Sequence, residues 1–333
     1  MLNPPIRLDM NEMPSPPPPH VIAGARRGLS RLNRYADPKD LARLRALLAE
    51  YAGVREGQLV VGPGSDLLLR QIIHAFARER TTITVSPTFL PTLETVRAVA
   101  ARWIGLRLSP PRFALEPGVL MDALEEPCLA IIDSPNNPTG QMLLDRETIR
   151  AVLESGETLL VIDEAYHEFA RESPDRSFVD MVEEYGNLAV TRTLDKGFGM
   201  AGARVGYAAV GEDFREAFFG FYAFLPQSSL HAAIEALENP GYVRETVRQL
   251  VEERERLREA LEHEGARVTP SCTNFLLVRT GVPDIARRLR DAGVLVSDLS
   301  SQLPDGFIRV SVGTRQENDA FLVAFRRSIG EDM

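Results

Sequence analysis

The chain has 333 residues, 44% of them apolar and 26% charged, a composition typical of one large globular domain or of two unequal ones. Its formal net charge of -9 argues against a nucleic acid partner, because binding to a phosphate backbone requires a basic surface. There is no apolar run long enough to cross a bilayer and no signal-peptide pattern at the start, so we expect no membrane partner and a cytoplasmic location. Cys128 and Cys272 show no C-x-x-C spacing, and we expect neither a disulfide nor a metal site.

The first segment of the chain, residues 1–36, is rich in proline. We expect it to form an extended arm, because proline interrupts the hydrogen bonding of helices and central strands. Asp37 and Pro38 are residue types of a helix N-cap and first turn, and the apolar spacing that follows predicts a helix that ends at Gly53.

Residues 37–225 predict a large α/β domain, in which a mostly parallel sheet of seven strands is sandwiched between helices. Residues 226–333 predict a smaller α+β domain. Ligands of parallel sheets bind beyond the carboxyl ends of the strands, so we expect the functional site at that edge. The strands expected in the large domain are Gln58–Val61, Thr81–Val85, Trp103–Leu106, Cys128–Asp133, Thr158–Asp163, Leu188–Thr193 and Val205–Val210. In the small domain we expect a helix at Tyr242–Glu264 and strands at Phe275–Arg279, Val294–Ser297 and Phe307–Val312.

Lysine is rare in this chain: among 38 basic residues only Lys39 and Lys196 are lysines. Lys39 lies in the first turn of the helix expected after Asp37, where a solvated surface charge is the ordinary interpretation. Lys196 instead follows an expected strand, within a glycine-rich apolar stretch. An amine at that position can form an imine with an aldehyde, and Arg204, further along, offers a bidentate grip on a phosphate.

Three other segments follow expected strands, and each has an ordinary structural interpretation when taken alone. Gly62 to Asp66 open a helix whose first amides could hold a phosphate, or are simply a capped helix start. Ser134 to Gly140 have the composition of a double turn. Asp163 could keep a ring nitrogen protonated, and Tyr166 could hydrogen-bond a phenolate oxygen, but Asp163 could equally cap the next helix. The order of these segments along the chain favours a common site.

The sequence resembles the fold-type I aminotransferases, and among them the branch of histidinol-phosphate aminotransferases. The resemblance covers nearly the whole chain, and it rests on the combination and order of several motifs. These are Met10-Asn11-Glu12, Asn33-Arg34-Tyr35, S-P-N-N-P-T-G from Ser134, D-E-A-Y from Asp163, R-T-L-D-K-G-F-G-M-A-G-A-R-V-G-Y from Arg192, and R-V-S-V-G-T-R from Arg309.

The resemblance implies an aspartate-aminotransferase-like fold, pyridoxal 5′-phosphate as the cofactor, and a set of catalytic residues. Lys196 carries the cofactor covalently and moves the proton between the substrate and the cofactor. Asp163 keeps the pyridine ring protonated, which makes the ring an electron sink. Tyr166 and Asn137 contact its phenolic oxygen.

Other residues are assigned by the same resemblance to the cofactor, to the substrate and to a partner subunit. Phe89 stacks on the ring, Arg309 receives the acidic group of the substrate, and Asn11 is a second substrate-binding residue. Tyr35 reaches the phosphate from the neighbouring subunit, which implies a homodimer. The phosphate itself is held by Ser65, Asp66, Thr193 and Arg204.

Two positions depart from the family pattern. Asp195 precedes the lysine where relatives usually carry a serine that helps hold the phosphate, and an ionised carboxylate there would repel a dianion unless it turns away or an arginine neutralises it. Ser297 stands where histidinol-phosphate enzymes usually carry an arginine that binds the distal phosphate of the substrate.

Three functions follow. The first is a transaminase that exchanges an amino group between an amino acid or amine and a 2-oxo acid such as 2-oxoglutarate; histidinol phosphate is the first expected donor and an aromatic amino acid the second. The second is a lyase of the threonine-phosphate decarboxylase type, which shares the fold. The third is a non-catalytic module that binds pyridoxal phosphate, against which the intact Lys196, Asp163 and Arg204 argue. In each case the partners are small molecules.

Overall fold

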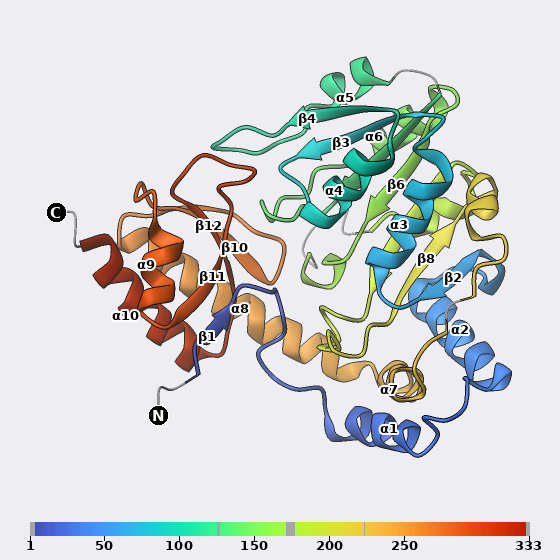
Figure 1. The fold of residues 1–333 in the computed structure, drawn as a ribbon, viewed down its shortest axis with the longest axis horizontal. Coiled ribbons are helices and arrows are strands. Elements are labelled where there is room, and N and C mark those ends of the chain that lie inside the picture. The colour runs from blue at the N-terminus through green and yellow to red at the C-terminus, as the bar shows by residue number, and fades with distance from the viewer. Residues whose placement is uncertain (1–3, 125–126, 171–176, 223, 331–333) are drawn as a thin grey trace.

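The computed structural model of the chain describes residues 4–124, 127–170, 177–222 and 224–330. Two sheets, each covered by helices, lie beside one another in Figure 1. The larger sheet has seven strands in the order β2-β8-β7-β6-β5-β3-β4, and the smaller has five in the order β1-β11-β12-β10-β9. Among the described residues, no helix is long and apolar enough to cross a membrane.

The seven-stranded sheet is mostly parallel, as predicted. Its strands are β2 (Leu59–Gly62), β3 (Thr81–Ser86), β4 (Arg102–Arg107), β5 (Cys128–Asp133), β6 (Leu159–Asp163), β7 (Leu188–Thr193) and β8 (Gly206–Val210). Only β8 runs antiparallel to its neighbours, β2 and β7. Alternate residues of β5 face two different apolar clusters, so the strand is buried on both faces. This explains why these strands read as continuous apolar runs instead of alternating ones.

Helices cover both faces of the larger sheet (Figure 1). The helices of this half of the molecule are α1 (Pro19–Leu29), α2 (Pro38–Ala52), α3 (Ser65–Phe76), α4 (Leu90–Val99), α5 (Pro117–Ala123), α6 (Arg146–Glu154) and α7 (Gln227–Glu238), on which α1 packs, with 3-10 turns at Glu56–Gln58, His167–Phe169, Val179–Glu183 and Glu212–Phe218. The boundaries predicted for α2 are confirmed: the carboxylate of Asp37 accepts a hydrogen bond from the amide of Lys39, and Gly53 ends the helix with a positive φ of 72°.

The smaller sheet consists of β1 (Ile6–Leu8), β9 (Arg267–Thr269), β10 (Phe275–Arg279), β11 (Val294–Asp298) and β12 (Phe307–Ser311), with helices α8 (Gly241–His263), α9 (Ile285–Asp291) and α10 (Arg315–Gly330). Helix α8 connects the two halves of the molecule. Its early residues Val243 and Val247 belong to the core of the larger sheet, and Leu257 and Leu261 belong to the core of the smaller one. The domain division at residue 225 stays a prediction.

The prediction of an extended arm over residues 1–36 is wrong in two places. Ile6–Leu8 form β1, which pairs in parallel with β11 of the smaller sheet. Pro19–Leu29 form helix α1, in which the proline occupies the first turn, where its missing N–H costs no hydrogen bond. Gly24 and Gly28 allow α1 to lie against α7, because a Cβ atom at either glycine would come within 2.6 Å of a backbone oxygen there.

Candidate active site

A cavity of about 610 Å³ lies at the carboxyl ends of β5, β6 and β7, where it is closed on the other side by residues from the N-terminal segment and the smaller sheet. Nearly all the residues that the sequence assigned to cofactor and substrate line this one cavity. They are Asn11, Ser65, Asp66, Phe89, Asn137, Asp163, Tyr166, Thr193, Lys196, Arg204 and Arg309. Tyr35 does not line it.

Lys196 extends into this cavity from the loop that follows β7. Its Nζ donates hydrogen bonds to the backbone carbonyls of Met10, at 3.3 Å, and Asn11, at 3.1 Å. It also lies 5.8 Å from the centre of the Tyr166 ring. The lysine amine is therefore held by the N-terminal segment, above the strand ends that carry the carboxylates.

Asp163 ends β6 at the floor of the cavity and is 8% exposed. Burial raises the pKa of its carboxyl to about 7, against a lowering effect of the hydrogen bond from the Thr191 hydroxyl at 2.9 Å. The charge of Asp133 adds to the increase. A carboxylate that is buried in this way gains most from a ligand that brings a positive charge, such as a protonated ring nitrogen.

Asp133 lines the same floor from the end of β5, and the sequence analysis gave it no role. Its Oδ1 accepts hydrogen bonds from the Thr88 hydroxyl at 2.9 Å and from Asn136 Nδ2 at 2.8 Å, and its Oδ2 accepts one from the amide of Asn137 at 2.9 Å. One carboxylate thus fixes the turn that carries Asn137 and the loop that carries Phe89. A polar residue at the end of an apolar strand, the signal that identified Asp163, was also present here.

Tyr166 connects the floor of the cavity to the N-terminal segment. Its hydroxyl accepts a hydrogen bond from Asn11 Nδ2 at 2.9 Å, and its ring packs edge-on against Phe275, with centroids 5.2 Å apart. Asn11 has a positive φ of 53°, and its amide and its Oδ1 both bind the hydroxyl of Ser311 on β12. Its carbonyl accepts from Asn274 as well as from Lys196. Asn11 therefore joins Lys196 and Tyr166 to the smaller sheet.

A second group of residues forms what we call the anion site: the first turn of α3 (Ser65 and Asp66) and the guanidinium of Arg204. The first amides of a helix leave N–H groups without intrahelical partners and attract negative charge. Gly64 gives Arg204 room, because a Cβ at that position would lie 2.4 Å from its Nη2. Arg204 Nη1 forms an ion pair with Asp195, so an arginine does neutralise the unusual carboxylate.

Thr193 lies beside the anion site and is buried. Its hydroxyl accepts a hydrogen bond from the amide of Asp195 at 3.1 Å and donates one to the carbonyl of Val205 at 3.3 Å. Thr193 lines the cavity, but its hydroxyl proton is directed at the protein backbone, so its predicted contact with a phosphate stays a prediction.

Arg309 enters the cavity from β12. Its Nη1 donates to Asn137 Oδ1 at 2.6 Å, and its Nη2 donates to the carbonyl of Asp9 at 2.7 Å. Its Nε has no hydrogen-bond partner among the described residues, and burial lowers the pKa of the guanidinium. A positively charged group with an unused donor is suited to a ligand carboxylate. Ser297, the position at which the resembled family usually carries an arginine, lines the same cavity together with Asp298.

Tyr35 lies outside the cavity on the surface, where 81% of it is exposed and its ring contacts Phe224 at a centroid distance of 5.0 Å. Several other large apolar residues near it in the sequence or near Phe224 are also exposed. They are Leu29, Leu32, Phe219 and Tyr222.

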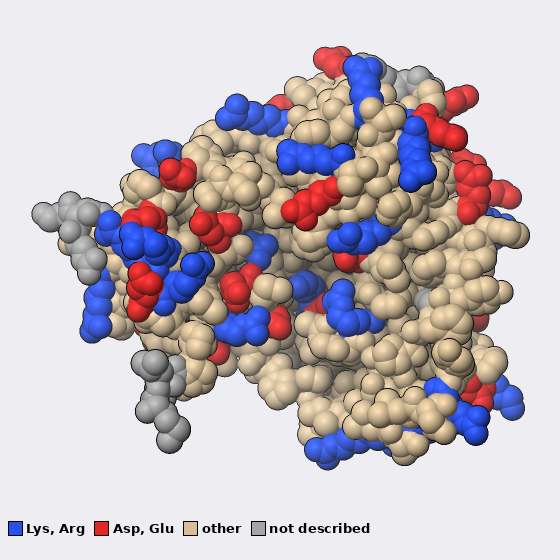
Figure 2. All heavy atoms as spheres, viewed as in Figure 1, with Lys and Arg blue, Asp and Glu red and all other residues tan. Residues whose placement is uncertain are grey.

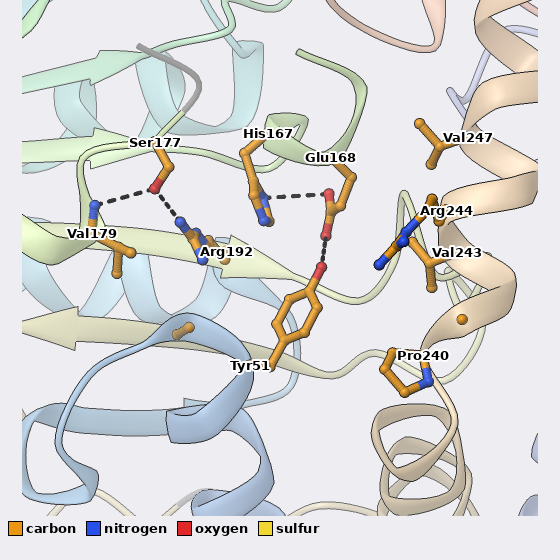
Figure 3. A pocket seen from close by; sticks show the side chains of 12 residues that line it. Tyr51, His167, Glu168, Ser177, Val179, Arg192, Pro240, Val243, Arg244 and Val247 are labelled. Atoms are coloured by element: carbon orange, nitrogen blue, oxygen red, sulfur yellow. Dashed lines mark hydrogen bonds and ion pairs between the residues drawn. The ribbon is translucent and has the colours of Figure 1, made fainter. Parts of the chain in front are cut away.

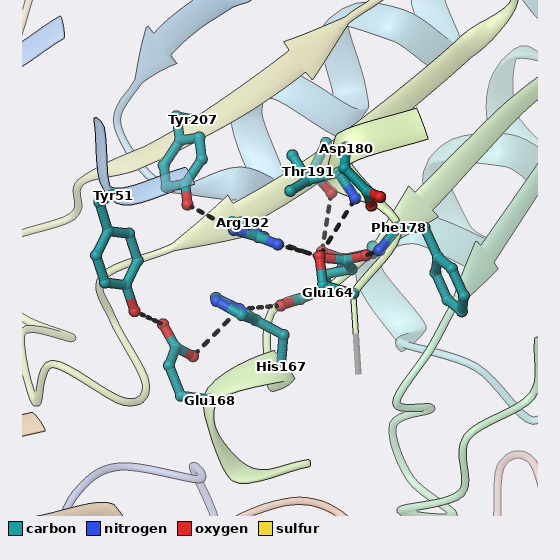
Figure 4. A network of polar contacts seen from close by, with 12 residues as sticks. Tyr51, Glu164, His167, Glu168, Phe178, Asp180, Thr191, Arg192 and Tyr207 are labelled. Carbon is teal, nitrogen blue, oxygen red and sulfur yellow. Dashed lines mark hydrogen bonds and ion pairs between the residues drawn. The ribbon is translucent and has the colours of Figure 1, made fainter. Parts of the chain in front are cut away.

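A buried ion pair lies at the ends of β6 and β7, and it was not predicted from the sequence. Arg192 Nε binds Glu164 Oε2 at 2.9 Å, and Arg192 Nη1 donates to the hydroxyl of Tyr207 at 3.3 Å (Figure 4). Both members of the pair are buried, and Glu164 also accepts from the amide of Phe178 at 2.6 Å. The pair joins Glu164, which follows Asp163 at the end of β6, to Arg192, which follows Thr191 on β7. It therefore fixes the ends of the two strands relative to each other.

A second cavity, of about 540 Å³, opens beside this network between Tyr51, Glu168 and the start of α8 (Figure 3). Burial raises the pKa of Glu168 to about 8. On the face shown in Figure 2, acidic and basic side chains are interspersed instead of forming one basic area.

The residues of the main cavity fit pyridoxal phosphate in three independent respects. Among the described residues that line the cavity, Lys196 supplies the amine that can condense with an aldehyde. Asp163 is a carboxylate whose pKa is raised by burial, so a positively charged ring nitrogen beside it would favour its ionised form. The anion site combines a helix N-terminus with Arg204, for which Gly64 leaves room.

Comparisons with known proteins agree with this chemistry. The family described as "Aminotransferase class I and II" matches residues 3–325. Histidinol-phosphate aminotransferase 2 of Archaeoglobus fulgidus is 35% identical over 96% of this chain and 92% of the relative, and the histidinol-phosphate aminotransferase of Thermococcus gammatolerans is 37% identical over 98% and 92%. The crystal structure of the enzyme from Sinorhizobium meliloti in complex with pyridoxal 5′-phosphate is similar with a TM-score of 0.85 at 25% identity, covering 98% of this chain and 91% of that one.

The fold and the family match together define a pyridoxal-phosphate-dependent transaminase with an aspartate-aminotransferase-like fold. The chain belongs to the aminotransferase class I and II family, as its motifs implied. L-threonine-O-3-phosphate decarboxylase from Porphyromonas gingivalis shares the fold with a TM-score of 0.83, at 22% identity. The lyase and the non-catalytic alternatives are not favoured, because the relatives with the higher identity are aminotransferases.

Proposed function

We propose that this aminotransferase takes its amino group from histidinol phosphate, with an aromatic amino acid as the second expected donor, and transfers it to a 2-oxo acid such as 2-oxoglutarate. The donor is supported by the names of relatives that are 33–37% identical over nearly the whole chain. The observation that carries the chemistry is the convergence of Lys196, Asp163 and Arg309 on one cavity.

When bound, pyridoxal phosphate supplies a ring that withdraws electrons from the α-carbon of the substrate. Lys196 Nζ takes the proton from that carbon as a general base, and it later donates a proton as a general acid. Asp163 keeps a proton on the ring nitrogen and compensates its charge. Tyr166, through its hydroxyl, and Asn137, through its side-chain amide, would hold the phenolic oxygen, and both line the cavity.

The remaining residues bind and orient. The amides of Ser65 and Asp66, with Arg204 and Thr193, receive the phosphate of the cofactor, and Phe89 stacks on its ring. Arg309 receives the acidic group of each substrate. This role is supported by the position of the Arg309 guanidinium in the wall of the cavity and by its hydrogen bond to Asn137, a residue proposed to contact the cofactor.

We also propose that the protein is a cytoplasmic homodimer, in which Tyr35 completes the site of the neighbouring subunit. This proposal is supported by the exposure of Tyr35 and Phe224 together with their ring contact. An apolar surface of this kind is typical of an interface, because large exposed apolar patches are rare on monomers. Leu29, Leu32, Phe219 and Tyr222 would extend the same surface.

The test begins with the absorbance spectrum of the purified protein, before and after addition of histidinol phosphate, phenylalanine or glutamate. We expect the band of the covalently bound cofactor to bleach with histidinol phosphate. A band that bleaches only with phenylalanine would change the assigned donor. A band that ignores every amine would contradict the proposed transamination, and release of carbon dioxide would indicate the lyase instead.

The rarity of lysine allows a matched control for the covalent attachment. Reduction of the holoenzyme with borohydride should label the peptide of Lys196 and leave the peptide of Lys39 unlabelled. Lys196→Ala should lose the label together with more than about a thousandfold of the activity, since removal of a general acid and base alone costs about 100-fold to 10,000-fold. Lys39→Ala should retain both. Label on Lys39 in the wild type would refute the assignment.

A further inference from the structure

Asp195 places a negative charge inside the anion site before any ligand arrives. Its side chain is 6% exposed, and its Oδ2 forms the ion pair with Arg204. Its other oxygen, Oδ1, is buried and has no hydrogen-bond partner among the described residues. A buried carboxylate oxygen without a donor is costly, which indicates that a ligand supplies the missing hydrogen bond.

The charges around Asp195 leave the anion site close to neutral. Arg204 contributes one positive charge, and Asp195 cancels it. Asp66 of α3 is paired with Arg70 at 3.2 Å, and Lys196 Nζ is directed at backbone carbonyls of the N-terminal segment. The positive charge that remains is the partial charge of about one half at the N-terminus of α3.

A fully deprotonated phosphate ester carries two negative charges, which this site does not balance. A phosphate ester that retains one proton carries a single negative charge. It also has an O–H group, which can donate to a carboxylate oxygen. Both properties match what Asp195 adds to the site.

We propose that Asp195 makes the anion site selective for a protonated phosphate: the carboxylate excludes the second negative charge, and its free Oδ1 accepts the hydrogen bond of the remaining P–O–H group. No bond forms or breaks, and the proton stays on the phosphate. The inference rests on the proposed function, because it assumes that the phosphate of the cofactor binds here.

Sulfate provides the discriminating probe, because near pH 6 it is a dianion with no proton to donate, whereas inorganic phosphate is largely protonated. The Kd of pyridoxamine 5′-phosphate, which avoids covalent attachment to Lys196, is measured by calorimetry on the full chain stripped of cofactor. The measurement is repeated with an excess of phosphate or of sulfate as competitor. The variants are Asp195→Ser and the isosteric Asp195→Asn, with Asp122→Asn, an exposed position in α5, as the control.

In the wild type and in Asp122→Asn, we expect phosphate to compete about tenfold better than sulfate, as one charge-assisted hydrogen bond allows. In both Asp195 variants this preference should fall to about twofold or less. An Asp195 variant that binds pyridoxamine 5′-phosphate but keeps the full preference would overturn the inference, while leaving the proposed function intact.

Arg204→Ala tests whether the phosphate binds at the anion site at all, separately from the selectivity of Asp195. We expect it to weaken pyridoxamine 5′-phosphate and to abolish competition by either anion. If phosphate competes with this variant as it does with the wild type, the phosphate binds elsewhere. The assignment of the anion site in the proposed function then fails, and the selectivity of Asp195 fails with it.

Discussion

Asp133 and Asp163 are register partners on the neighbouring parallel strands β5 and β6, so two buried carboxylates lie side by side at the floor of the active site. Burial is the main cause that raises the pKa of each, to about 6 for Asp133 and about 7 for Asp163. Their surroundings differ. Asp133 accepts hydrogen bonds from Thr88, Asn136 and Asn137, whereas the side chain that binds Asp163 is Thr191. We therefore infer that Asp133 is a positioning residue and that Asp163 is the carboxylate available to the proposed cofactor.

Asp133→Asn should lower kcat/KM by about 10-fold to 100-fold, because an amide group cannot accept hydrogen bonds at both of its ends, and each lost bond to a charged acceptor costs about 1.5–3 kcal/mol. The released groups belong to the loops that carry Phe89 and Asn137. A shift in the pH profile of the cofactor absorbance should accompany the loss, since the ring contacts change. Exposed Asp122→Asn is the control. An Asp133→Asn enzyme with unaltered kinetics and spectrum would show that these bonds do not position the ring contacts.

Asp163 should make the cofactor-free chain less stable as the pH rises. The pKa of an unfolded aspartate is 3.8 and that of Asp163 in the fold is about 7, so between these values the folded chain holds a proton that the unfolded chain has lost. The stability that protonated Asp163 contributes is complete below pH 3.8 and is lost as the pH increases through about 7. Between about pH 4 and about pH 8, the free energy of unfolding of the wild type should fall by about 2–4 kcal/mol more than that of Asp163→Asn, at about 1.4 kcal/mol per pKa unit.

Urea unfolding curves at several pH values measure this difference. Glu168 contributes in the same direction in both proteins. The charge of Asp133 raises the pKa of Asp163, and the interaction is reciprocal, so replacing Asp163 also changes the titration of Asp133, and the measured difference belongs to the pair. Asp122→Asn should follow the wild type. Parallel curves for the wild type and Asp163→Asn would mean that Asp163 titrates in the fold as it does in the unfolded chain.

The larger sheet and most of the active site were predictable because the signals are local. Strands such as Leu188–Thr193, buried on both faces, appear as unbroken apolar runs. The residues that follow Asp163 and Thr193 are then brought to one edge by the parallel arrangement alone. Asp133 carried the same local signal and was hidden only by the turn-forming residues next to it.

The features that were missed depend on contacts between distant parts of the chain. Helix α1 forms because Gly24 and Gly28 let it pack on α7, and β1 forms because Ile6–Leu8 pair with a strand near residue 294. The pairing of β1 leaves no pattern in the first 36 residues. Helix α1 does leave one, since Val21, Gly24 and Gly28 follow the first-turn proline at helical spacing, but the prolines before it favoured an extended segment. The ion pair of Arg192 and Glu164 likewise becomes visible only when β6 and β7 are adjacent.

Arg309→Gln should raise the KM for the 2-oxo acid by about 10-fold to 100-fold, which corresponds to the loss of a charge-assisted, bidentate contact of about 1.5–3 kcal/mol. We expect a smaller change in kcat, because the catalytic amine is untouched. Steady-state kinetics with 2-oxoglutarate measure both. Arg279→Gln, at an exposed position of β10, is the matched control. If Arg309→Gln lowers kcat and leaves KM unchanged, Arg309 acts on the transition state and does not bind the substrate carboxylate in the ground state.

The proposed exchange of Tyr35 between subunits predicts that two defective chains complement each other. Tyr35→Ala should bind the cofactor weakly, and Lys196→Ala should be inactive. In a mixed dimer, one site combines Lys196 of the first chain with Tyr35 of the second and is complete, while the other site has neither. Random reassortment of equal amounts makes about half of the dimers mixed, each with one complete site, so about a quarter of the wild-type activity should return. Activity is measured after the two variants are unfolded and refolded together, with each refolded alone as a control. If the mixture gains nothing over the separate chains although mixed dimers form, Tyr35 does not serve the neighbouring site.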